Sequence, residues 1–437
     1  MTDGVSRRSF LSLAGASLAG AWAGSYLSAL AGPDPPSIVL ILADDLGYGD
    51  LGCYGNRAIR TPRLDRLSAQ GLHLTQYYAG APVCAPSRCA MLTGLQARHG
   101  RVADNPGVPL LPSDRTLAEL LKAREYATGM FGKWHLGAEG TTGAPNRKGF
   151  DHAFGVWDAH QAFSHRLPWL WRDGVLTSTP EGWTPDVLAS AAAVWIGQQT
   201  GPFFCYYAPC LVHANLSAPE ERIAQYRGIW PETPFPGDRL YAPCAEPNAT
   251  YAAMATWLDE CVGRLLDAAP KDTLIVFASD NGPHPSGGRD VALQGSTGGL
   301  RGIKNDCYEG GIRVPCVLRW PGHVPAGQSS AVICAAWDIM PTLALAGGAQ
   351  VSDNLDGIDL MPVWQRGAAM PTRALHWQCK HNQGIRAGRW KAVKPARFNR
   401  NTPWELYNLE ADVGETTDLA AEHPDILRRI LRGVSDA

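Results

Sequence analysis

Two apolar runs, each followed by oxygen-bearing side chains, constrain the fold of this chain more than any other feature. Residues 37–43 read Ser-Ile-Val-Leu-Ile-Leu-Ala and residues 273–279 read Thr-Leu-Ile-Val-Phe-Ala-Ser. Runs without polar alternation are typical of central strands in a parallel sheet that helices cover on both faces. Asp44-Asp45 follows the first run and Asp280-Asn281 follows the second. Because ligand sites in such sheets lie at the carboxyl ends of the strands, the sequence predicts an α/β fold with a polar site there.

The same four residues predict a metal site. Two aspartates directly after a buried strand are costly unless they are paired or bind a cation, which disfavours the alternative of a solvated acidic turn. The four residues offer hard oxygen donors and no thiolate, a set that suits Ca²⁺ or Mg²⁺. The 11 cysteines include no Cys-x-x-Cys pair, so a zinc cage is not indicated, and their disulfide pairing stays open.

A third stretch predicts a nucleophile at the start of a helix. Residues 83–94 read Val-Cys-Ala-Pro-Ser-Arg-Cys-Ala-Met-Leu-Thr-Gly, in which Pro86 suits the first helical turn and Gly94 suits a C-terminal cap. Cys84 would lie just outside the helix N-terminus, where free N–H groups attract an anion. Arg88, one helical turn on, favours a low-pKa thiolate at Cys84. The alternative for Cys84 is a buried cysteine on a capped helix.

Cys-x-Pro-Ser-Arg followed by Met-Leu-Thr-Gly resembles the signature of the type I sulfatases. Further stretches that resemble this family are Ala43–Asp50, Gly132–Gly137 (Gly-Lys-Trp-His-Leu-Gly), Gly298–Lys304, Tyr308–Pro315, and Leu406–Leu409 with Glu415 and Leu419. The resemblance runs from residue 37 to about residue 424. It implies a large α/β domain like that of alkaline phosphatase, with a mostly parallel central sheet flanked by helices.

The resemblance also implies the chemistry. In this family a maturation enzyme oxidises the cysteine to formylglycine, so Cys84 would be the precursor of an aldehyde whose hydrate attacks sulfur. The metal held by the two polar pairs would also contact residue 84. The other implied roles are sulfate binding by Arg88, Lys133 and Lys304, protonation of the leaving alcohol by His213 or Lys304, proton removal by His135, and a place in the cleft for His284. Lys133 and His135 lie two residues apart, so on an extended segment both would point to one face.

Residues 155–185 look like a long insertion of loops rich in aromatic side chains. They include Trp157, Trp169, Trp171, Trp183, His160 and His165. Loops of that length often line a binding cleft, although ordinary aromatic packing is an equal alternative. Because aromatic faces suit sugar rings, Trp169, Trp171 and the amide of Asn215 are predicted to contact a sulfated saccharide. The sequence also resembles bacterial sulfatases that act on sulfated saccharides, including the N-acetylgalactosamine sulfatase-like group.

The predicted activity is therefore hydrolysis of sulfate monoesters, from a small sulfated molecule or a sulfated saccharide. One alternative is a phosphonate or phosphate ester hydrolase of the same superfamily, and another is a saccharide-binding homologue that has lost the chemistry. The full set of polar motif residues argues against the second alternative. With 39 Lys and Arg against 41 Asp and Glu, the net charge of -2 offers no basic excess for phosphates, so nucleic acid is not the expected partner.

The two ends of the chain differ from the rest. Residues 6–11 (Ser-Arg-Arg-Ser-Phe-Leu) and the weakly apolar stretch that ends in Ala-Leu-Ala at 29–31 resemble a twin-arginine export signal over residues 1–31, with a membrane anchor as the alternative. We expect the export machinery to deliver the protein to the periplasm or outside the cell. A catalytic α/β domain is predicted over residues 32–366. Short strand patterns and a final helix predict an α+β subdomain with a small antiparallel sheet over residues 367–437.

Overall fold

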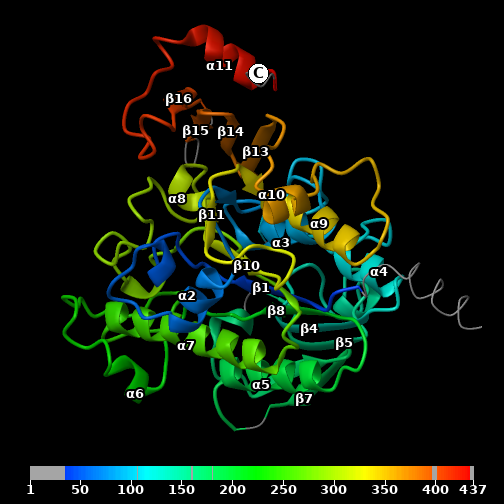
Figure 1. Cartoon of the computed structure of the whole chain (residues 1–437). Helices are drawn as coiled ribbons and strands as arrows, with labels where there is room; N and C mark the ends of the chain where they lie inside the picture. Colours follow the sequence, from blue (N-terminus) through cyan, green and yellow to red (C-terminus); the bar gives the residue numbers. More distant parts are fainter. Residues whose placement is uncertain (1–34, 106, 159–160, 180, 396–400, 434–437) are drawn as a thin grey trace, which may run out of the picture. The chain divides into compact units, whose positions relative to one another are not determined.

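A ten-stranded sheet organises the part of the chain that the computed structural model describes, residues 35–105, 107–158, 161–179, 181–395 and 401–433. Its strands are β1 (Ile38–Ala43), β2 (Leu72–Leu74), β4 (Ala127–Lys133), β5 (His152–Val156), β6 (Trp169–Arg172), β7 (Val175–Ser178), β8 (Phe203–Ala208), β9 (Leu274–Ser279), β10 (Cys316–Arg319) and β11 (Gln328–Ser330). Their order is β11-β2-β10-β9-β1-β8-β4-β5-β6-β7 (Figure 1). The five neighbours from β9 to β5 run parallel, whereas β10 and β6 are antiparallel to them. The two predicted central strands are β1 and β9, and the α/β fold class is confirmed.

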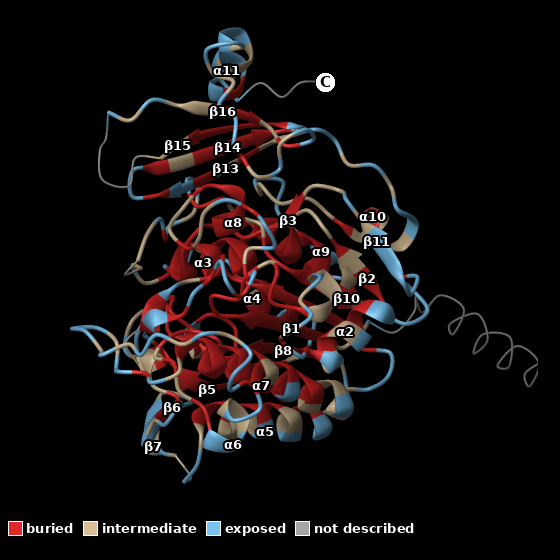
Figure 2. Ribbon diagram, turned by 90° about the vertical axis from the view of Figure 1, so that its left-hand side faces the viewer, coloured by how far each residue is buried: buried red, intermediate tan, exposed pale blue. Residues whose placement is uncertain are grey.

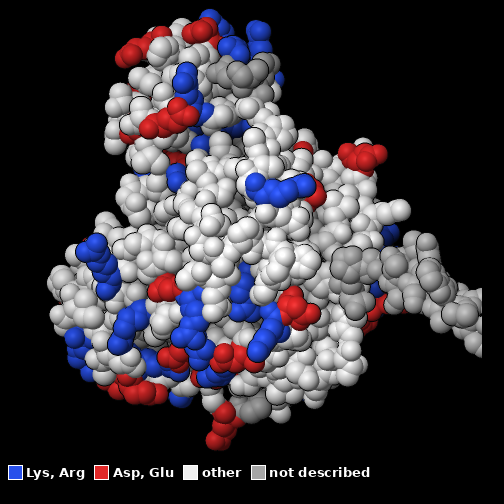
Figure 3. All heavy atoms as spheres, in the orientation of Figure 1, with Lys and Arg blue, Asp and Glu red and all other residues white. Residues whose placement is uncertain are grey.

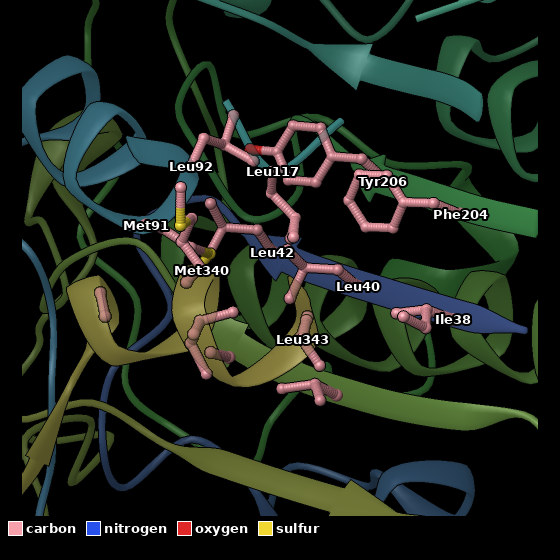
Figure 4. Packing of buried hydrophobic residues seen from close by; sticks show 14 of the residues in the cluster. Ile38, Leu40, Leu42, Met91, Leu92, Leu117, Phe204, Tyr206, Met340 and Leu343 are labelled. Atoms are coloured by element: carbon pink, nitrogen blue, oxygen red, sulfur yellow. The ribbon is translucent and has the colours of Figure 1, made fainter. Parts of the chain in front are cut away.

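Helices cover both faces of this sheet. The helices of this part of the chain are α2 (Pro62–Ala69), α3 (Cys84–Thr93), α4 (Leu117–Lys122), α5 (Thr184–Gly197), α6 (Glu220–Ile223), α7 (Pro247–Ala268), α8 (Glu309–Ile312), α9 (Ile339–Ala346) and α10 (Met361–Arg366). The even-numbered residues of β1 pack with α3, α4 and α9 (Figure 4), and the odd-numbered residues pack with α2, α5 and α7. Because both faces of β1 are buried, every position in it is apolar, which explains why its sequence does not alternate.

Short elements complete the main part of the chain. They are the two-stranded sheet of β3 (Tyr77–Tyr78) and β12 (Cys334–Ala335), and the 3-10 turns η1 (Gly52–Tyr54), η2 (Pro145–Arg147), η3 (Gln161–Phe163), η4 (Ser286–Gly288) and η5 (Ala336–Asp338). Two of these turns, η3 and η4, lie in loops that reach the active site described below.

Residues 155–185 are more regular than the sequence suggested. The structure adds β6 and β7 to the sheet as an antiparallel hairpin, with Trp171 opposite Leu176, so the expectation of a loop insertion is wrong for residues 169–178. The cause is the turn at Asp173 and Gly174, whose φ angles are 49° and 81°. Two central residues with positive φ form the hairpin turn that fits the twist of the flanking strands, and Asp-Gly is a typical sequence for it. His160 lies outside the described residues.

A four-stranded antiparallel sheet near the C-terminus confirms the second predicted sheet. Its strands, in order, are β13 (Ala374–Cys379), β14 (Asn382–Ala387), β15 (Trp390–Lys394) and β16 (Glu405–Asn408), followed by α11 (Pro424–Leu431). One face packs Trp377 with residues of α3 and α8, and the other packs Trp390 against Ile430 of α11. Figure 2 shows α3, α8 and much of β13, β14 and β15 as buried. The proposed domain boundary at residue 367 stays a prediction.

Charged side chains are buried where β15 meets α8. Lys391 Nζ lies 2.8 Å from Glu309 Oε1 and 2.9 Å from Glu415 Oε1, and none of these three side chains has exposed surface. Arg313 and Arg386 lie 3.4 Å and 4.0 Å from Glu309 Oε2. We call these five residues the junction cluster. They join the second sheet to α8 by ionic contacts in addition to the apolar packing.

Four further features bear on the remaining expectations. The predicted export signal, residues 1–31, falls outside the described residues. No helix in the described part of the chain is long and apolar enough to cross a membrane. All 11 cysteines are described and none is in a disulfide. On the face shown in Figure 3, Lys and Arg side chains mix with Asp and Glu side chains.

Candidate active site

The carboxyl ends of four neighbouring parallel strands converge on one site. They and the loops that follow carry Asp44 and Asp45 (after β1), His213 (after β8), Lys133 and His135 (at the end of β4), and Asp280, Asn281, His284 and Lys304 (after β9), while α3 adds Cys84 and Arg88. Each of these residues is buried except His284, which is half-buried. The structure thus brings together the residues predicted to act in metal binding and catalysis, while their individual roles stay predictions.

Three carboxylates and a thiol share the centre of the site. The Asp45 N–H donates to Asp280 Oδ1 at 3.1 Å, and Asn281 Nδ2 donates to Asp45 Oδ1 at 2.7 Å. Cys84 Sγ lies 3.5 Å from Asp44 Oδ1 and 3.8 Å from Asp45 Oδ1. Acidic oxygens from two strands therefore surround the side chain at the start of α3.

Two lysines pair with these carboxylates, one with each residue of the Asp44-Asp45 pair. Lys133 Nζ donates to Asp44 Oδ2 at 2.7 Å, and Lys304 Nζ donates to Asp45 Oδ2 at 2.7 Å. An ammonium group has three donors, so each lysine keeps hydrogens for acceptors other than its aspartate. Both are placed to meet an anion that binds beside residue 84.

Arg88 donates hydrogen bonds to protein groups through all three of its guanidinium nitrogens. Its Nε and Nη2 donate to Asp280 Oδ2 at 3.0 Å and 2.7 Å, and its Nη1 donates to the Lys133 carbonyl at 2.9 Å. Its side chain has no exposed surface. Arg88 therefore ties α3 to the ends of β9 and β4 and holds the Asp280 carboxylate in place.

The carboxyl groups and one amide fit a bound cation. Burial, together with the charges of Asp44 and Asp45, raises the pKa of Asp280 to about 6 despite the adjacent guanidinium. Burial opposes ionisation of the other two as well, but the neighbouring cations outweigh it, so the pKa of Asp44 is held well below its ordinary value and that of Asp45 falls to about 2. Asn281 Oδ1 is buried without a hydrogen-bond partner. A divalent cation would offset the repulsion among the carboxylates and give this oxygen a partner.

Cys84 is not the thiolate that its sequence neighbours suggested. It is the first residue of α3, with Val83 as the N-cap and Gly94 closing the helix at φ 74°. Burial raises the pKa of its thiol, because the two lysines lower that pKa by less. The expectation of a low-pKa thiolate is therefore wrong, since Arg88 faces carboxylates and not sulfur. A buried, protonated thiol is a poor nucleophile in its own right.

His213 presents one ring nitrogen to the site. Its Nδ1 lies 2.5 Å from the Ala214 carbonyl oxygen, which can only accept, so Nδ1 carries the hydrogen and Nε2 faces the cluster. Nε2 lies 3.6 Å from Asp45 Oδ2, and ligating atoms of Asp44, Asp45, Cys84 and His213 all lie within 4.8 Å of one another. Burial lowers the pKa of His213 to about 4.

His135 lies where the chain leaves β4. Its φ of 65° shows that the segment after Lys133 is not extended, contrary to expectation. The backbone turns there while the His135 N–H donates to the Trp157 carbonyl at 3.2 Å. Burial and the charge of Lys133 lower the pKa of His135 to about 2, and its Nδ1 is buried without a partner.

Two family models match this chain. The sulfatase family model matches residues 36–349, and a model described as "N-sulphoglucosamine sulphohydrolase, C-terminal" matches residues 304–430. The chain belongs to the sulfatase family. It is 32% identical to steryl-sulfatase of Mus musculus, over 93% of this chain and 82% of that protein, and 33% identical to arylsulfatase A of Homo sapiens, over 91% and 86%.

A solved structure supports the same assignment. The crystal structure of Ps i-CgsB in complex with k-i-k-neocarrahexaose superposes with a TM-score of 0.79 at 28% identity and covers 91% of this chain and 92% of that one. This sulfatase is accordingly an enzyme that hydrolyses sulfate esters. Sulfatases in general use a formylglycine and a divalent metal, and the buried cluster of two aspartates, a cysteine and a histidine is compatible with both.

The residues predicted to contact a saccharide lie in different settings. Trp169 is 52% exposed on β6, whereas Trp171 stacks on Trp157 with ring centroids 6.4 Å apart and joins the core. Asn215 Oδ1 accepts a hydrogen bond from the Ala242 N–H at 2.8 Å. His284 accepts from the Ser286 N–H through Nδ1 at 2.8 Å and contributes to the charge environment of Asp45. Contact of these residues with substrate stays a prediction.

Four further residues lie near the site of this sulfatase: three of them were not singled out from the sequence, and His165 was named only as part of the aromatic stretch. His165 Nε2 donates to the His213 carbonyl at 3.1 Å, and Asn105 Oδ1 accepts from the Ala85 N–H at 3.0 Å, beside the nucleophile position. Phe163 stacks on the His213 ring, and Tyr241 packs against Phe163. All four lie in turns or loops, where no periodic pattern marks them.

Proposed function

We propose that this sulfatase cleaves sulfate monoesters with residue 84 as the nucleophile, after a maturation enzyme has oxidised Cys84 to formylglycine. The observation that carries the proposal is the position of Cys84 Sγ, 3.5 Å and 3.8 Å from two carboxylates that each also bind a lysine. A nucleophile placed there stands between a site for a cation and two ammonium groups. That arrangement suits the attack of an oxygen nucleophile on a sulfate group.

Asp44, Asp45, Asp280 and Asn281 are the proposed ligands of a Ca²⁺ ion, with Mg²⁺ as the alternative. When bound, such an ion stabilises an oxyanion and lowers the pKa of a hydroxyl group that it contacts. Arg88 keeps the Asp280 carboxylate oriented towards this position through its two hydrogen bonds. Oxygen ligands from two strands and no thiolate in the set favour a hard cation.

Lys133 and Lys304 are proposed to bind the sulfate oxygens through the ammonium hydrogens that their aspartates leave free. His213, whose Nε2 faces the cluster, or Lys304 would deliver the proton to the leaving alcohol. His135 would then remove a proton at residue 84 so that sulfate can leave. Preorganised charge around the sulfate group is expected to supply the largest share of the catalysis.

The proposed substrates are sulfated saccharides. The neocarrahexaose complex of the similar structure supports this proposal, as does the exposed face of Trp169 on β6. Export through the twin-arginine machinery, with delivery to the periplasm or outside the cell, is proposed from residues 6–31.

Mass spectrometry and a paired assay test the proposal. The tryptic peptide of residues 67–88 from active enzyme should carry an aldehyde in place of the thiol of Cys84. The same preparation should release sulfate from an aryl sulfate much faster than phosphate from the matching aryl phosphate. An active preparation whose peptide retains only thiol would refute the nucleophile, and faster phosphate release would favour the phosphatase alternative.

A further inference from the structure

The rings of Phe163 and Tyr241 stand beside the catalytic cluster and come from two loops that are far apart in the sequence. We propose that they form an aromatic wall that contacts the leaving alcohol of the substrate, and that Asn215 positions both rings. Resting on the proposed function, this gives the enzyme a preference for sulfate esters of ring-bearing alcohols over those of linear alcohols.

Most side chains of the catalytic cluster are closed to solvent, and the partly exposed ones include Lys304, His213 and His135. The side chains of Asp44, Lys133, Arg88 and Asp280 have no exposed surface. The side chain of Lys304 keeps 9% of its surface exposed and that of His213 keeps 7%. In the proposed path a sulfate ester passes Lys304 and His213, the two of these residues that contact Asp45, and its alcohol part remains at this opening.

The aromatic wall begins at this opening. The ring of Phe163 is stacked on that of His213, with centroids 5.1 Å apart and an interplanar angle of 12°. Tyr241 lies 5.6 Å from Phe163 at 43° and 6.2 Å from His284 at 54°. His213 Nε2 is in turn 3.6 Å from Asp45 Oδ2, so Phe163 packs on a residue that directly approaches the carboxylates of the cluster. A flat ring attached to the ester oxygen can contact these faces, whereas a flexible chain gains less from them.

Asn215 connects the two loops that carry the wall. Its N–H donates to the Phe163 carbonyl at 3.0 Å, and its Oδ1 accepts from the Ala242 N–H, next to Tyr241, at 2.8 Å. Asp238 Oδ1 accepts from the Tyr241 N–H at 2.7 Å and closes the turn that presents this ring. A wall whose backbone is fixed before substrate arrives loses little conformational entropy on binding.

Three sulfate esters and a set of single variants test the wall. The substrates are 4-nitrophenyl sulfate, a monosaccharide 6-sulfate and hexyl sulfate, assayed by sulfate release. We expect Tyr241→Ala to lower kcat/KM about tenfold on the ring esters, mainly through KM, and less than twofold on hexyl sulfate. Leu240→Ala, which removes a 63% exposed neighbour from the same turn, is the matched control and should keep wild-type values.

The positioning role of Asn215 has its own comparison. Asn215→Ala should reproduce the loss of ring selectivity seen in Tyr241→Ala, and Asn215→Asp, which keeps an acceptor for Ala242, should restore the ratio of ring to linear turnover. A wild-type ratio in Asn215→Ala would overturn this role. Thermal unfolding checks each variant. Tyr241→Leu, which keeps bulk without a ring, replaces Tyr241→Ala if that variant does not fold, and Asn215→Leu replaces Asn215→Ala in the same way.

The results separate this proposal from the function on which it rests. Equal losses on all three esters in Tyr241→Ala, no loss on any, or a wild-type preference for hexyl sulfate would overturn the wall while leaving a sulfatase. A larger loss on the aryl ester or on the sugar ester would show which kind of ring the wall contacts, and either supports it. No sulfate release from any ester by enzyme with a verified aldehyde would instead overturn the proposed function.

Discussion

The active site and the junction cluster both bury carboxylates against lysine and arginine, but they arrange these charges differently. In the active site three aspartates lie together, and each has its own cation: Lys133 for Asp44, Lys304 for Asp45 and Arg88 for Asp280. In the junction cluster Lys391 lies between Glu309 and Glu415, so opposite charges alternate. The Tyr78 hydroxyl adds a hydrogen bond to Glu309 Oε2 at 2.6 Å. Thus only the active site directs several acidic groups at one point.

This difference supports the proposal that a bound cation completes the active site. Like charges that converge in a buried place destabilise one another, and here they leave Asn281 Oδ1 and His135 Nδ1 without partners. Alternating charges need no further ion, although burying them gains little net stability over apolar packing. We therefore expect changes in the active site to act on turnover and changes in the junction cluster to act on folding.

The largest effect is expected from Cys84→Ala. Turnover should fall by roughly 10⁴-fold or more, as when a covalent nucleophile is removed from other hydrolases, with little change in stability because the side chain is small. Cys89→Ala, on the same helix, is the control and should remain active. A Cys84→Ala protein with a substantial fraction of wild-type activity on an aryl sulfate would contradict the formylglycine mechanism.

The second-largest effect on turnover is expected from removal of the metal. Chelation should abolish activity and lower the melting temperature, because the three aspartates would then repel one another without a cation, and added Ca²⁺ or Mg²⁺ should restore both. Activity and unfolding are measured on the same samples, with metal content determined by elemental analysis. A metal-free sample that stays fully active would exclude the proposed metal site.

The junction cluster should show the opposite response in Lys391→Met. Removing the shared cation leaves the buried Glu415 without its ion-pair partner, while Glu309 keeps Arg313 and Arg386, and this should cost about 3–5 kcal/mol in the free energy of unfolding. The turnover of the remaining folded enzyme should change little. Denaturant unfolding gives the stability, and turnover per folded molecule gives the activity; unchanged stability would show that the cluster does not hold the two sheets together.

Lys304→Ala and Lys133→Ala should lower turnover more than stability, in contrast to Lys391→Met. Each removes a positive charge from the place proposed for sulfate, so turnover should fall on the order of 10²-fold, by analogy with loss of one oxyanion donor. Stability should change less than in Lys391→Met, because the bound metal still neutralises the aspartates. Near-normal kinetics in either variant would place that lysine outside the sulfate site.

The features that could be predicted from the sequence are those that depend on local patterns. The apolar run before Asp44, the run before Asp280 and the helix after Val83 are local patterns, and the structure has a strand or helix at each. The pKa of Cys84 could not be predicted from such patterns, because it depends on burial and on lysines supplied by two other segments. Phe163 and Tyr241 lie in loops whose meeting at His213 depends on long-range packing, so no spacing in the sequence marks them.

The smallest effect is expected from pH, and it should appear in the stability of the junction cluster. Burial, reinforced by the charge of Glu309, raises the pKa of Glu415 to about 7, despite Lys391. The folded protein then holds this proton more tightly than the unfolded chain, so the associated stability is present at acidic pH and is lost as pH rises through about 7. In Glu415→Gln this decline should disappear. Between pH 5 and pH 7.5 the free energy of unfolding of the variant should fall by about 1 kcal/mol or more less than that of the wild type, since one pKa unit corresponds to ~1.4 kcal/mol. Parallel denaturation curves for the two proteins across that range would show that Glu415 is ionised throughout, and Glu410→Gln, at an exposed position nearby in the sequence, serves as the control for the loss of a charge alone.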